Sequence, residues 1–218
     1  FTPEDLNEEQ QMIIDTVVSF VDSEITPIYD RIEHQEPGLT ESLLMKAGEL
    51  GLLGLAIPEE YGGMGKDFNT NSLLIEYLAK SRSFSLSLGA HIGIGTLPIV
   101  YFGNEKQKSY YLPKLASGEL KACYCLTEPS SGSDALGAKT TAVLNPEGTH
   151  YIVNGQKMWI TNSGFADVFI VFCQIDGNKF SCLILEKGMD GLTLGAEEKE
   201  MGIKGSSTRQ VFLENVKV

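Results

Sequence analysis

Apolar positions in the first half of the chain recur at the spacing of an amphipathic helix. Asn7 can cap a helix that begins at Glu8, and the apolar residues that follow are Met12, Ile13, Val17, Phe20, Val21 and Ile25. Side chains three and four positions apart share one face of an α-helix, so this spacing predicts a helix with one buried face. Pro27 is expected to interrupt or end it, because proline has no N–H to donate.

The helical pattern continues to about residue 118. Further helices are predicted to begin near Thr40 and Asn69 and to cover His91–Tyr101 and Glu105–Leu115. Gly51 and Gly54 should stop the helix that begins near Thr40. The run 58–65 reads Pro-Glu-Glu-Tyr-Gly-Gly-Met-Gly and is predicted to be irregular, because its glycines favour turns with positive φ.

Near Gly118 the pattern changes to short runs of β-branched and aromatic residues, which are typical of strands. The runs are Ala122–Thr127, Lys139–Leu144, His150–Val153, Val168–Ile175, Phe180–Leu185 and Gln210–Leu213. Turn residues separate them: Asn145-Pro146-Glu147-Gly148, Asn154-Gly155, Asp176-Gly177-Asn178 and Asp190-Gly191. We therefore predict an α+β chain, with an all-helical domain over residues 1–118 and a small antiparallel β-barrel or sandwich over residues 119–218.

Composition narrows the classes of function. The 218 residues are 42% apolar and 21% charged, as in an ordinary globular protein, and the formal net charge is −12. That excess of acid argues against a nucleic-acid partner, yet backbone N–H groups can still hold a phosphate-bearing cofactor. No run approaches the roughly 20 apolar residues of a membrane span, and the opening Phe1-Thr2-Pro3-Glu4-Asp5 is too acidic for a signal peptide.

The four cysteines do not predict a metal site. Cys123, Cys125, Cys173 and Cys182 form no CxxC pair and have no histidine at ligand spacing. Cys123 and Cys125 share one face if they lie on a strand. Free thiols in a core are the favoured interpretation.

The segment 124–134 combines the residue types that can surround a planar ligand and its phosphates. It reads Tyr-Cys-Leu-Thr-Glu-Pro-Ser-Ser-Gly-Ser-Asp, with three serines, one threonine and a glycine that lets the backbone approach closely. An ordinary turn capped by Asp134 explains the same composition, so both interpretations stay open from the residues alone.

This segment resembles the first signature of acyl-CoA dehydrogenases, a Thr-Glu-Pro followed two residues later by Gly-Ser-Asp. The run Lys157–Asn162, Lys-Met-Trp-Ile-Thr-Asn, is similar to the second flavin-contacting strand of that family. The resemblance continues through Ile57–Gly63 and Gly103–Lys108. The wording of Met201–Thr208 most resembles the long- and very-long-chain branch.

The resemblance implies roles for particular residues toward FAD. Tyr124 to Ser133 should line the flavin, with the backbone of Leu126 and Thr127 and the Thr127 hydroxyl near its pyrimidine edge. Gly132 and Ser133 should lie at the pyrophosphate, and Ser133 should also touch the acyl-CoA. Trp159 should pack beside the isoalloxazine ring, and Ile160 next to it is expected to belong to the cofactor-binding strand. Thr161 should donate a hydrogen bond to N5, where a donor stabilises the charge that develops. A core position is the alternative for Trp159, the only tryptophan.

The activity implied is FAD-dependent oxidation of fatty acyl-CoA to trans-2-enoyl-CoA in fatty acid β-oxidation, with electrons passed to an electron-transferring flavoprotein. The family's base is a glutamate in a C-terminal helical domain, and no residue here matches it; Glu128 is expected to be structural. We therefore expect the 218 residues alone to be inactive and to hold FAD weakly. The resemblance further implies a homodimer or homotetramer, in the bacterial cytoplasm or the mitochondrial matrix.

Two other functions remain as alternatives at this stage. An acyl-CoA oxidase would reoxidise its flavin with oxygen, and an assembly or binding relative would not turn over at all. His34, His91 and His150 share no pattern and are expected to be structural or exposed. Gly93, Gly95 and Thr96 either allow close helix packing or open a longer channel for the acyl tail.

Overall fold

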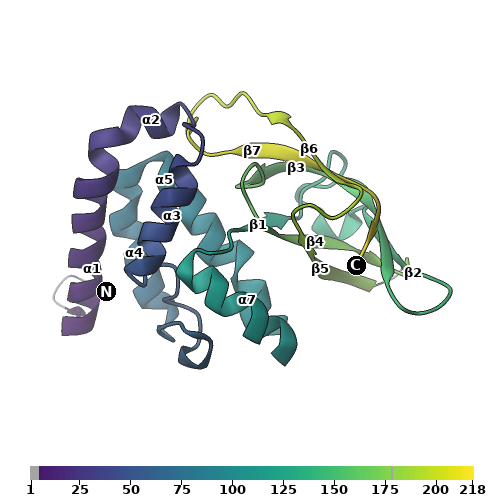
Figure 1. Ribbon diagram of the computed structural model, residues 1–218, viewed down its shortest axis with the longest axis horizontal. Coiled ribbons are helices and arrows are strands. Elements are labelled where there is room, and N and C mark those ends of the chain that lie inside the picture. Colours follow the sequence, from purple (N-terminus) through teal and green to yellow (C-terminus); the bar gives the residue numbers. More distant parts are fainter. Residues whose placement is uncertain (1–4, 178) are drawn as a thin grey trace. The chain divides into compact units, whose positions relative to one another are not determined.

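The computed structural model describes residues 5–177 and 179–218 and divides the chain into two compact units (Figure 1). The helical unit ends at Leu120 but also includes the later segment Met201–Ser206. The β unit holds Lys121–Glu200 and Ser207–Val218. Residues 1–4 and Asn178 lie outside the described residues. The interpretation of the chain's opening and the turn expected at Asp176-Gly177-Asn178 involve these residues.

The helical unit follows the predicted order of helices. They are α1 (Glu8–Phe20), α2 (Tyr29–Glu33), α3 (Leu39–Glu49), α4 (Phe68–Leu78), α5 (Ser83–Ala90), α6 (Leu97–Phe102) and α7 (Glu105–Ser117). Asn7 caps α1 as predicted, since its side chain accepts from the N–H of Gln10 at 2.8 Å. Pro27 interrupts the helix as expected, within the one-turn helix η3 (Thr26–Ile28) that follows the π-turn η2 (Val21–Ile25).

Two local expectations for this unit need correction. Helix α5 is not predicted from the sequence, because its buried residues include the serines Ser83 and Ser87 while Leu86 is exposed, so no single apolar stripe marks it. The run 58–65 is not wholly irregular, since η4 (Glu59–Tyr61) forms one helical turn within it.

The Tyr61 hydroxyl donates to the Glu105 carboxylate at 2.9 Å, and this bond raises the pKa of Tyr61 to about 12.

The stretch Ser83–Phe102 joins α5, the π-helix η6 (His91–Gly95) and α6. Its 20 residues have a mean hydropathy of 1.4 over the best window, so the stretch is long and apolar enough to cross a membrane, contrary to the expectation from the sequence. More than half of that window, 56%, is buried inside the structure, which is also typical of a core helix. One such stretch is weak evidence for a membrane span.

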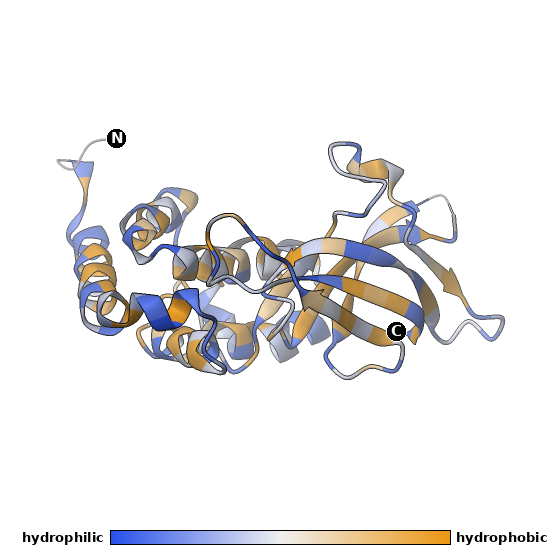
Figure 2. Cartoon of the chain, turned by 90° about the horizontal axis from the view of Figure 1, so that it is seen from above, coloured by the Kyte–Doolittle hydropathy of each residue, from blue (hydrophilic) through white to orange (hydrophobic). Residues whose placement is uncertain are grey.

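The β unit is one seven-stranded sheet whose strands carry long apolar stretches (Figure 2). The strands are β1 (Ala122–Cys125), β2 (Thr141–Leu144), β3 (Tyr151–Thr161), β4 (Val168–Ile175), β5 (Lys179–Glu186), β6 (Leu192–Glu197) and β7 (Thr208–Lys217). The order is β1-β4-β2-β3-β7-β6, and β5 pairs with the other edge of β4. A helical half followed by a β half confirms the predicted fold class.

The sheet is mixed rather than wholly antiparallel. β1 and β2 both run parallel to β4, one beside its first half and one beside its end, whereas the other four pairings are antiparallel. Asn154-Gly155 was expected to be a turn but lies inside β3. The ladder absorbs the irregularity opposite it, where β7 carries an extra residue and Asn215 has φ +53°.

The core of the β unit is built from alternate strand residues and includes three of the four cysteines. Cys123, Cys125 and Cys173 are buried and Cys182 is half-buried, and all four are free thiols, as expected. The sulfurs of Cys123 and Cys125 lie 3.8 Å apart on one face of β1. Burial raises the pKa of the Cys123 thiol well above its ordinary value, so this thiol is unreactive.

Candidate functional site

The residues assigned to a cofactor lie on two segments of the β unit. The first segment is the end of β1 and the loop after it, with Tyr124, Leu126, Thr127, Gly132 and Ser133. The second is the end of β3, which carries Trp159, Ile160 and Thr161. The Met158 N–H donates to the Thr127 carbonyl at 2.9 Å, so the two segments are in direct contact.

A buried ion pair also joins the two segments. The ammonium of Lys157, on β3, lies 2.7 Å from a carboxylate oxygen of Glu128, and the exposed fractions of the two side chains are 0% and 3%. The same ammonium donates to the Leu126 carbonyl at 3.0 Å. Lys157 therefore bonds to the residues on both sides of Thr127, while Met158 bonds to Thr127 itself.

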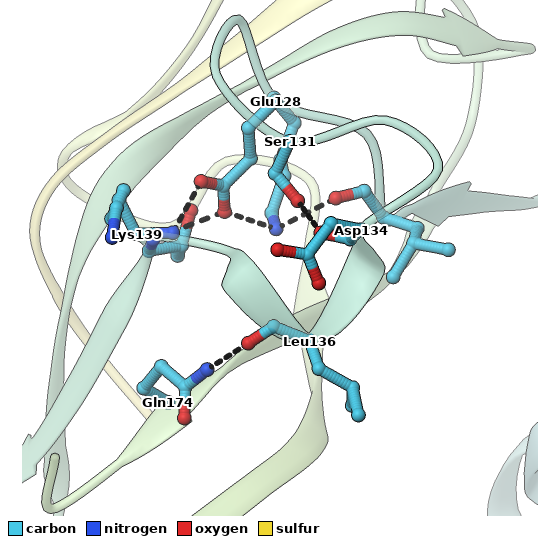
Figure 3. Close-up of polar contacts among 9 residues, drawn as sticks. Glu128, Ser131, Asp134, Leu136, Lys139 and Gln174 are labelled. Atoms are coloured by element: carbon cyan, nitrogen blue, oxygen red, sulfur yellow. Dashed lines mark hydrogen bonds and ion pairs between the residues drawn. The ribbon is translucent and has the colours of Figure 1, made fainter. Parts of the chain in front are cut away.

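Glu128 organises the loop as well as the ion pair (Figure 3). Its carboxylate accepts the backbone N–H groups of Lys139 at 2.6 Å and Thr140 at 3.0 Å, where the loop rejoins β2. Burial alone would raise the pKa of Glu128, but the hydrogen bonds from Lys157, Thr140 and Lys139 outweigh it and hold that pKa below its ordinary value. The structure thus supports a structural role for Glu128, since both of its carboxylate oxygens already accept hydrogen bonds.

The loop between these ends is tied to itself and to the sheet. The backbones of Glu128 and Ser131 exchange two hydrogen bonds, at 3.0 and 3.1 Å, and the Ser131 hydroxyl donates to the Asp134 carbonyl at 2.6 Å. Gln174 on β4 donates to the Leu136 carbonyl at 2.7 Å, a contact also drawn in Figure 3. The loop is more than a turn capped by Asp134.

Gly132 and Ser133 lie exposed at the outer part of this loop. A Cβ at Gly132 would meet no atom within 4 Å, so no described part of the chain requires glycine there. A backbone without a side chain, next to a hydroxyl, suits the close approach of a phosphate group. These two residues fit the role expected of them.

Trp159 is exposed because β3 bulges at this point. Between Lys157 and Ile160 the strand carries one more residue than β7, and Trp159 has φ +58°, which is rare for a bulky residue. Without the extra residue, Trp159 would share the buried face of Lys157, since strand side chains alternate. With it, Ile160 is buried and the Trp159 side chain is 61% exposed, so a core role for this tryptophan is wrong.

A second cluster holds the end of β3. Thr161 pairs with Thr208 on β7, and the Asn162 N–H donates to the Ser207 carbonyl at 2.8 Å. Glu197 on β6 accepts from the Ser207 hydroxyl at 2.7 Å, from the Thr208 N–H at 2.9 Å and from the Arg209 guanidinium at 2.6 Å. The turn after Thr161 is thereby fixed to β6 and β7.

Gly164 in that turn has no room for a side chain. A Cβ there would lie 2.2 Å from the Ser207 hydroxyl oxygen, 2.9 Å from Glu197 and 3.0 Å from Arg209. Glycine is therefore required by the packing of the Glu197 cluster against the turn.

Comparison with known proteins identifies both units. The family model described as the acyl-CoA dehydrogenase N-terminal domain matches residues 7–119, and the model of the middle domain of the same family matches residues 123–216. The chain belongs to the acyl-CoA dehydrogenase family.

Individual acyl-CoA dehydrogenases are similar over the whole chain. A probable acyl-CoA dehydrogenase of Bacillus subtilis is 56% identical over 218 residues, and the human mitochondrial very long-chain specific enzyme is 40% identical over 227. The crystal structure of a Bacillus anthracis acyl-CoA dehydrogenase complexed with FAD matches 100% of the chain with 56% identity and a TM-score of 0.97. The chain spans 37%, 35% and 37% of these three relatives, respectively.

Several residues of this acyl-CoA dehydrogenase site were not singled out from the sequence: Lys157, Glu197, Arg209 and Gly164. Lys157 had a visible signal, because a lysine inside an apolar strand run must be exposed or paired. The Glu197 cluster had none, since β6 was not predicted and the partners of Glu197 lie 10 to 12 residues away, in Ser207 and at the start of β7. Among the described residues, no group of three or more His, Cys, Asp or Glu side chains could hold a metal ion.

Proposed function

We propose that this chain supplies the helical and flavin-binding parts of an FAD-dependent acyl-CoA dehydrogenase. The reaction is the oxidation of fatty acyl-CoA to trans-2-enoyl-CoA, with electrons passed to an electron-transferring flavoprotein. The observation that carries the proposal is the exposed Trp159 with the half-buried Thr161 two residues on. Both lie at a strand end that is held against the Thr127 segment by the Met158–Thr127 hydrogen bond and the buried Lys157–Glu128 pair. We further propose residues 1–118 and 119–218 as the two domains, the second binding flavin and acyl-CoA.

The residues present fit the cofactor. The exposed face of Trp159 can pack against the flavin ring, and the half-buried Thr161 hydroxyl can donate to N5. The exposed Gly132–Ser133 backbone and hydroxyl suit the pyrophosphate. When bound, FAD supplies the acceptor for the hydride that leaves Cβ of the thioester.

The base that removes the Cα proton is proposed to lie outside these 218 residues. Glu128 cannot serve, because its carboxylate is buried and already bound to Lys157 and two backbone N–H groups. We expect the chain alone to be inactive and to hold FAD weakly. We propose a homodimer or homotetramer, as the family resemblance implies. The bacterial cytoplasm is the proposed compartment, since one similar protein is from Bacillus subtilis, and the mitochondrial matrix is the alternative, since the human relative is mitochondrial.

A cavity in the helical unit supports a site for the acyl tail. It measures about 330 Å³ and lies between α4 and the Ser83–Phe102 helix, with apolar walls that include Ile75, Ile92 and Leu97. Gly89 and Gly93 line it, and a Cβ at Gly93 would meet no atom within 4 Å. Gly95 and Thr96 are buried and do not line it, so Gly93 is the residue to test. We expect Gly93→Leu to shorten the preferred acyl chain, and an unchanged preference would remove this assignment.

The proposed function is tested by an anaerobic titration of the full-length protein with palmitoyl-CoA, following flavin absorbance. Bleaching at one equivalent per flavin is the expected result, and shorter acyl chains would then rank the substrates. Rapid reoxidation by oxygen with release of peroxide would identify an oxidase instead. A protein without flavin, or with a flavin that no acyl-CoA reduces, would favour an assembly or binding role.

A further inference from the structure

Lys157 and Glu128 are not among the residues expected to contact the cofactor, yet each lies close in sequence to residues that are. Lys157 comes two residues before Trp159, and Glu128 comes directly after Thr127. Both side chains are almost completely buried, and their ion pair joins two segments that are 29 residues apart in sequence. Burying two charges costs free energy that their mutual attraction need not recover. The contribution of the pair is therefore sought in the particular segments that it joins.

The contacts lock the two segments in one alignment. Lys157 donates to the Leu126 carbonyl and to Glu128, while Met158 donates to the Thr127 carbonyl. Three consecutive residues of the loop are thereby matched to two consecutive residues of β3. Directed hydrogen bonds specify this alignment, whereas apolar contacts would tolerate a shift.

The same lock adjoins the bulge that exposes Trp159. Lys157 is the last paired residue before the bulge and is fully buried, so it anchors the strand on the side from which Trp159 turns outward. Moving Lys157 would move the Trp159 ring and the backbone of Leu126 and Thr127 together.

We propose that Lys157 and Glu128 are positioning residues of the flavin site, which align its two walls without touching the cofactor. This inference rests on the proposed function, because it concerns the same FAD site. Lys157 has the larger role, since it bonds directly to the Leu126 carbonyl. Glu128 acts through Lys157 and through the backbone N–H groups of Lys139 and Thr140.

The test is FAD affinity and the flavin absorbance spectrum in the full-length protein, with melting temperature measured in parallel. The variants are Lys157→Met, Glu128→Gln and the double variant that combines them. The control is Leu185→Ala, a buried core residue on β5, which pairs with the edge of β4 opposite β1 and β2. Leu185→Ala is expected to lower the melting temperature of the same unit, because it leaves a cavity in the core, while the Lys157–Glu128 ion pair stays intact.

A positioning role and a purely stabilising role predict different results for the double variant. Removing both charges should restore part of the melting temperature lost in Lys157→Met, because no unpaired carboxylate stays buried. FAD affinity should stay low, because the Leu126 carbonyl still lacks its donor. We expect FAD to bind about tenfold more weakly in both variants that lack Lys157, with an altered spectrum, and within about twofold of wild type in Leu185→Ala.

A third readout needs no cofactor. Hydrogen exchange of the Met158 N–H, which donates to Thr127, should accelerate in Lys157→Met more than in Leu185→Ala. If Lys157→Met does not fold, Glu128→Gln replaces it, with an expected loss of FAD affinity of about fivefold.

Unchanged FAD affinity and spectrum in the folded variants would overturn the inference and leave the proposed function standing. A wild-type protein that binds no FAD would overturn the proposed function itself.

Discussion

Two ion pairs lie near the end of β3 that carries Trp159 and Thr161, and they differ chiefly in burial. Lys157 and Glu128 are 0% and 3% exposed, whereas Arg209 and Glu197 are 33% and 27% exposed. Both carboxylates also accept backbone N–H groups, so the local chemistry is similar. Burial is therefore expected to decide how much stability is lost when each pair is broken.

The largest effect is expected from breaking the buried pair on one side. Lys157→Met leaves the Glu128 carboxylate buried without its cation, and such a change destabilises a protein by about 3–5 kcal/mol. Urea unfolding of the chain, followed by the fluorescence of its single tryptophan Trp159, measures this loss. A loss no larger than that of Glu197→Gln would contradict the contrast between the two pairs.

The second-largest loss of stability is expected at Gly164, which packs against the half-exposed Arg209–Glu197 pair. A Cβ at Gly164 would overlap the Ser207 hydroxyl and press on Glu197 and Arg209, so Gly164→Ala should cost about 1–3 kcal/mol through overpacking. Gly132→Ala is the matched control, because a Cβ there meets no atom within 4 Å. Equal unfolding midpoints for the two variants would show that the turn after Thr161 moves freely and that the cluster does not fix it.

These two glycines also show which parts of the site can be predicted from the sequence. The caps and apolar spacing of the helices are local signals, and so are the residue types of the 124–134 segment. The exposure of Trp159 is not local, because it depends on a bulge defined by the pairing of β3 with β7. The need for glycine at position 164 depends on Glu197 and Arg209, more than 30 residues away in sequence. Long-range pairing is the information that the linear pattern lacks.

The stabilisation that Glu128 provides should depend on pH. Its pKa is held below the ordinary value in the folded state, so the stabilisation is fully present above the unfolded pKa of about 4.3 and is lost as the pH falls through the folded pKa. The difference in unfolding free energy between wild type and Glu128→Gln should therefore be constant near neutrality and shrink below about pH 5. Unfolding curves across this range measure it, and a difference that grows toward acid would have the wrong sign.

The half-exposed pair should show a smaller loss. Glu197→Gln keeps one acceptor oxygen, which can serve the Thr208 N–H while the amide NH2 donates to the Ser207 oxygen. It loses the attraction to Arg209, which solvent screens in part, so we expect about 1–2 kcal/mol. The loss should diminish in high salt, unlike that of Lys157→Met, since only exposed charges are strongly screened. Identical salt dependence for both variants would show that burial does not separate them.

A more exposed pair in the helical unit should show the smallest effect of the three ion pairs. Arg31 and Glu36 lie 2.6 Å apart with side chains 53% and 43% exposed, and their hydrogen bond lowers the pKa of Glu36. The N···O distance equals that between Arg209 and Glu197. Water nevertheless competes for both charged groups, and holding the two side chains in one geometry costs conformational entropy. Glu36→Gln should leave the melting temperature unchanged within error. A clear drop would mean that geometry, not burial, controls these ion pairs, and the contrast between Lys157–Glu128 and Arg209–Glu197 would then need another explanation.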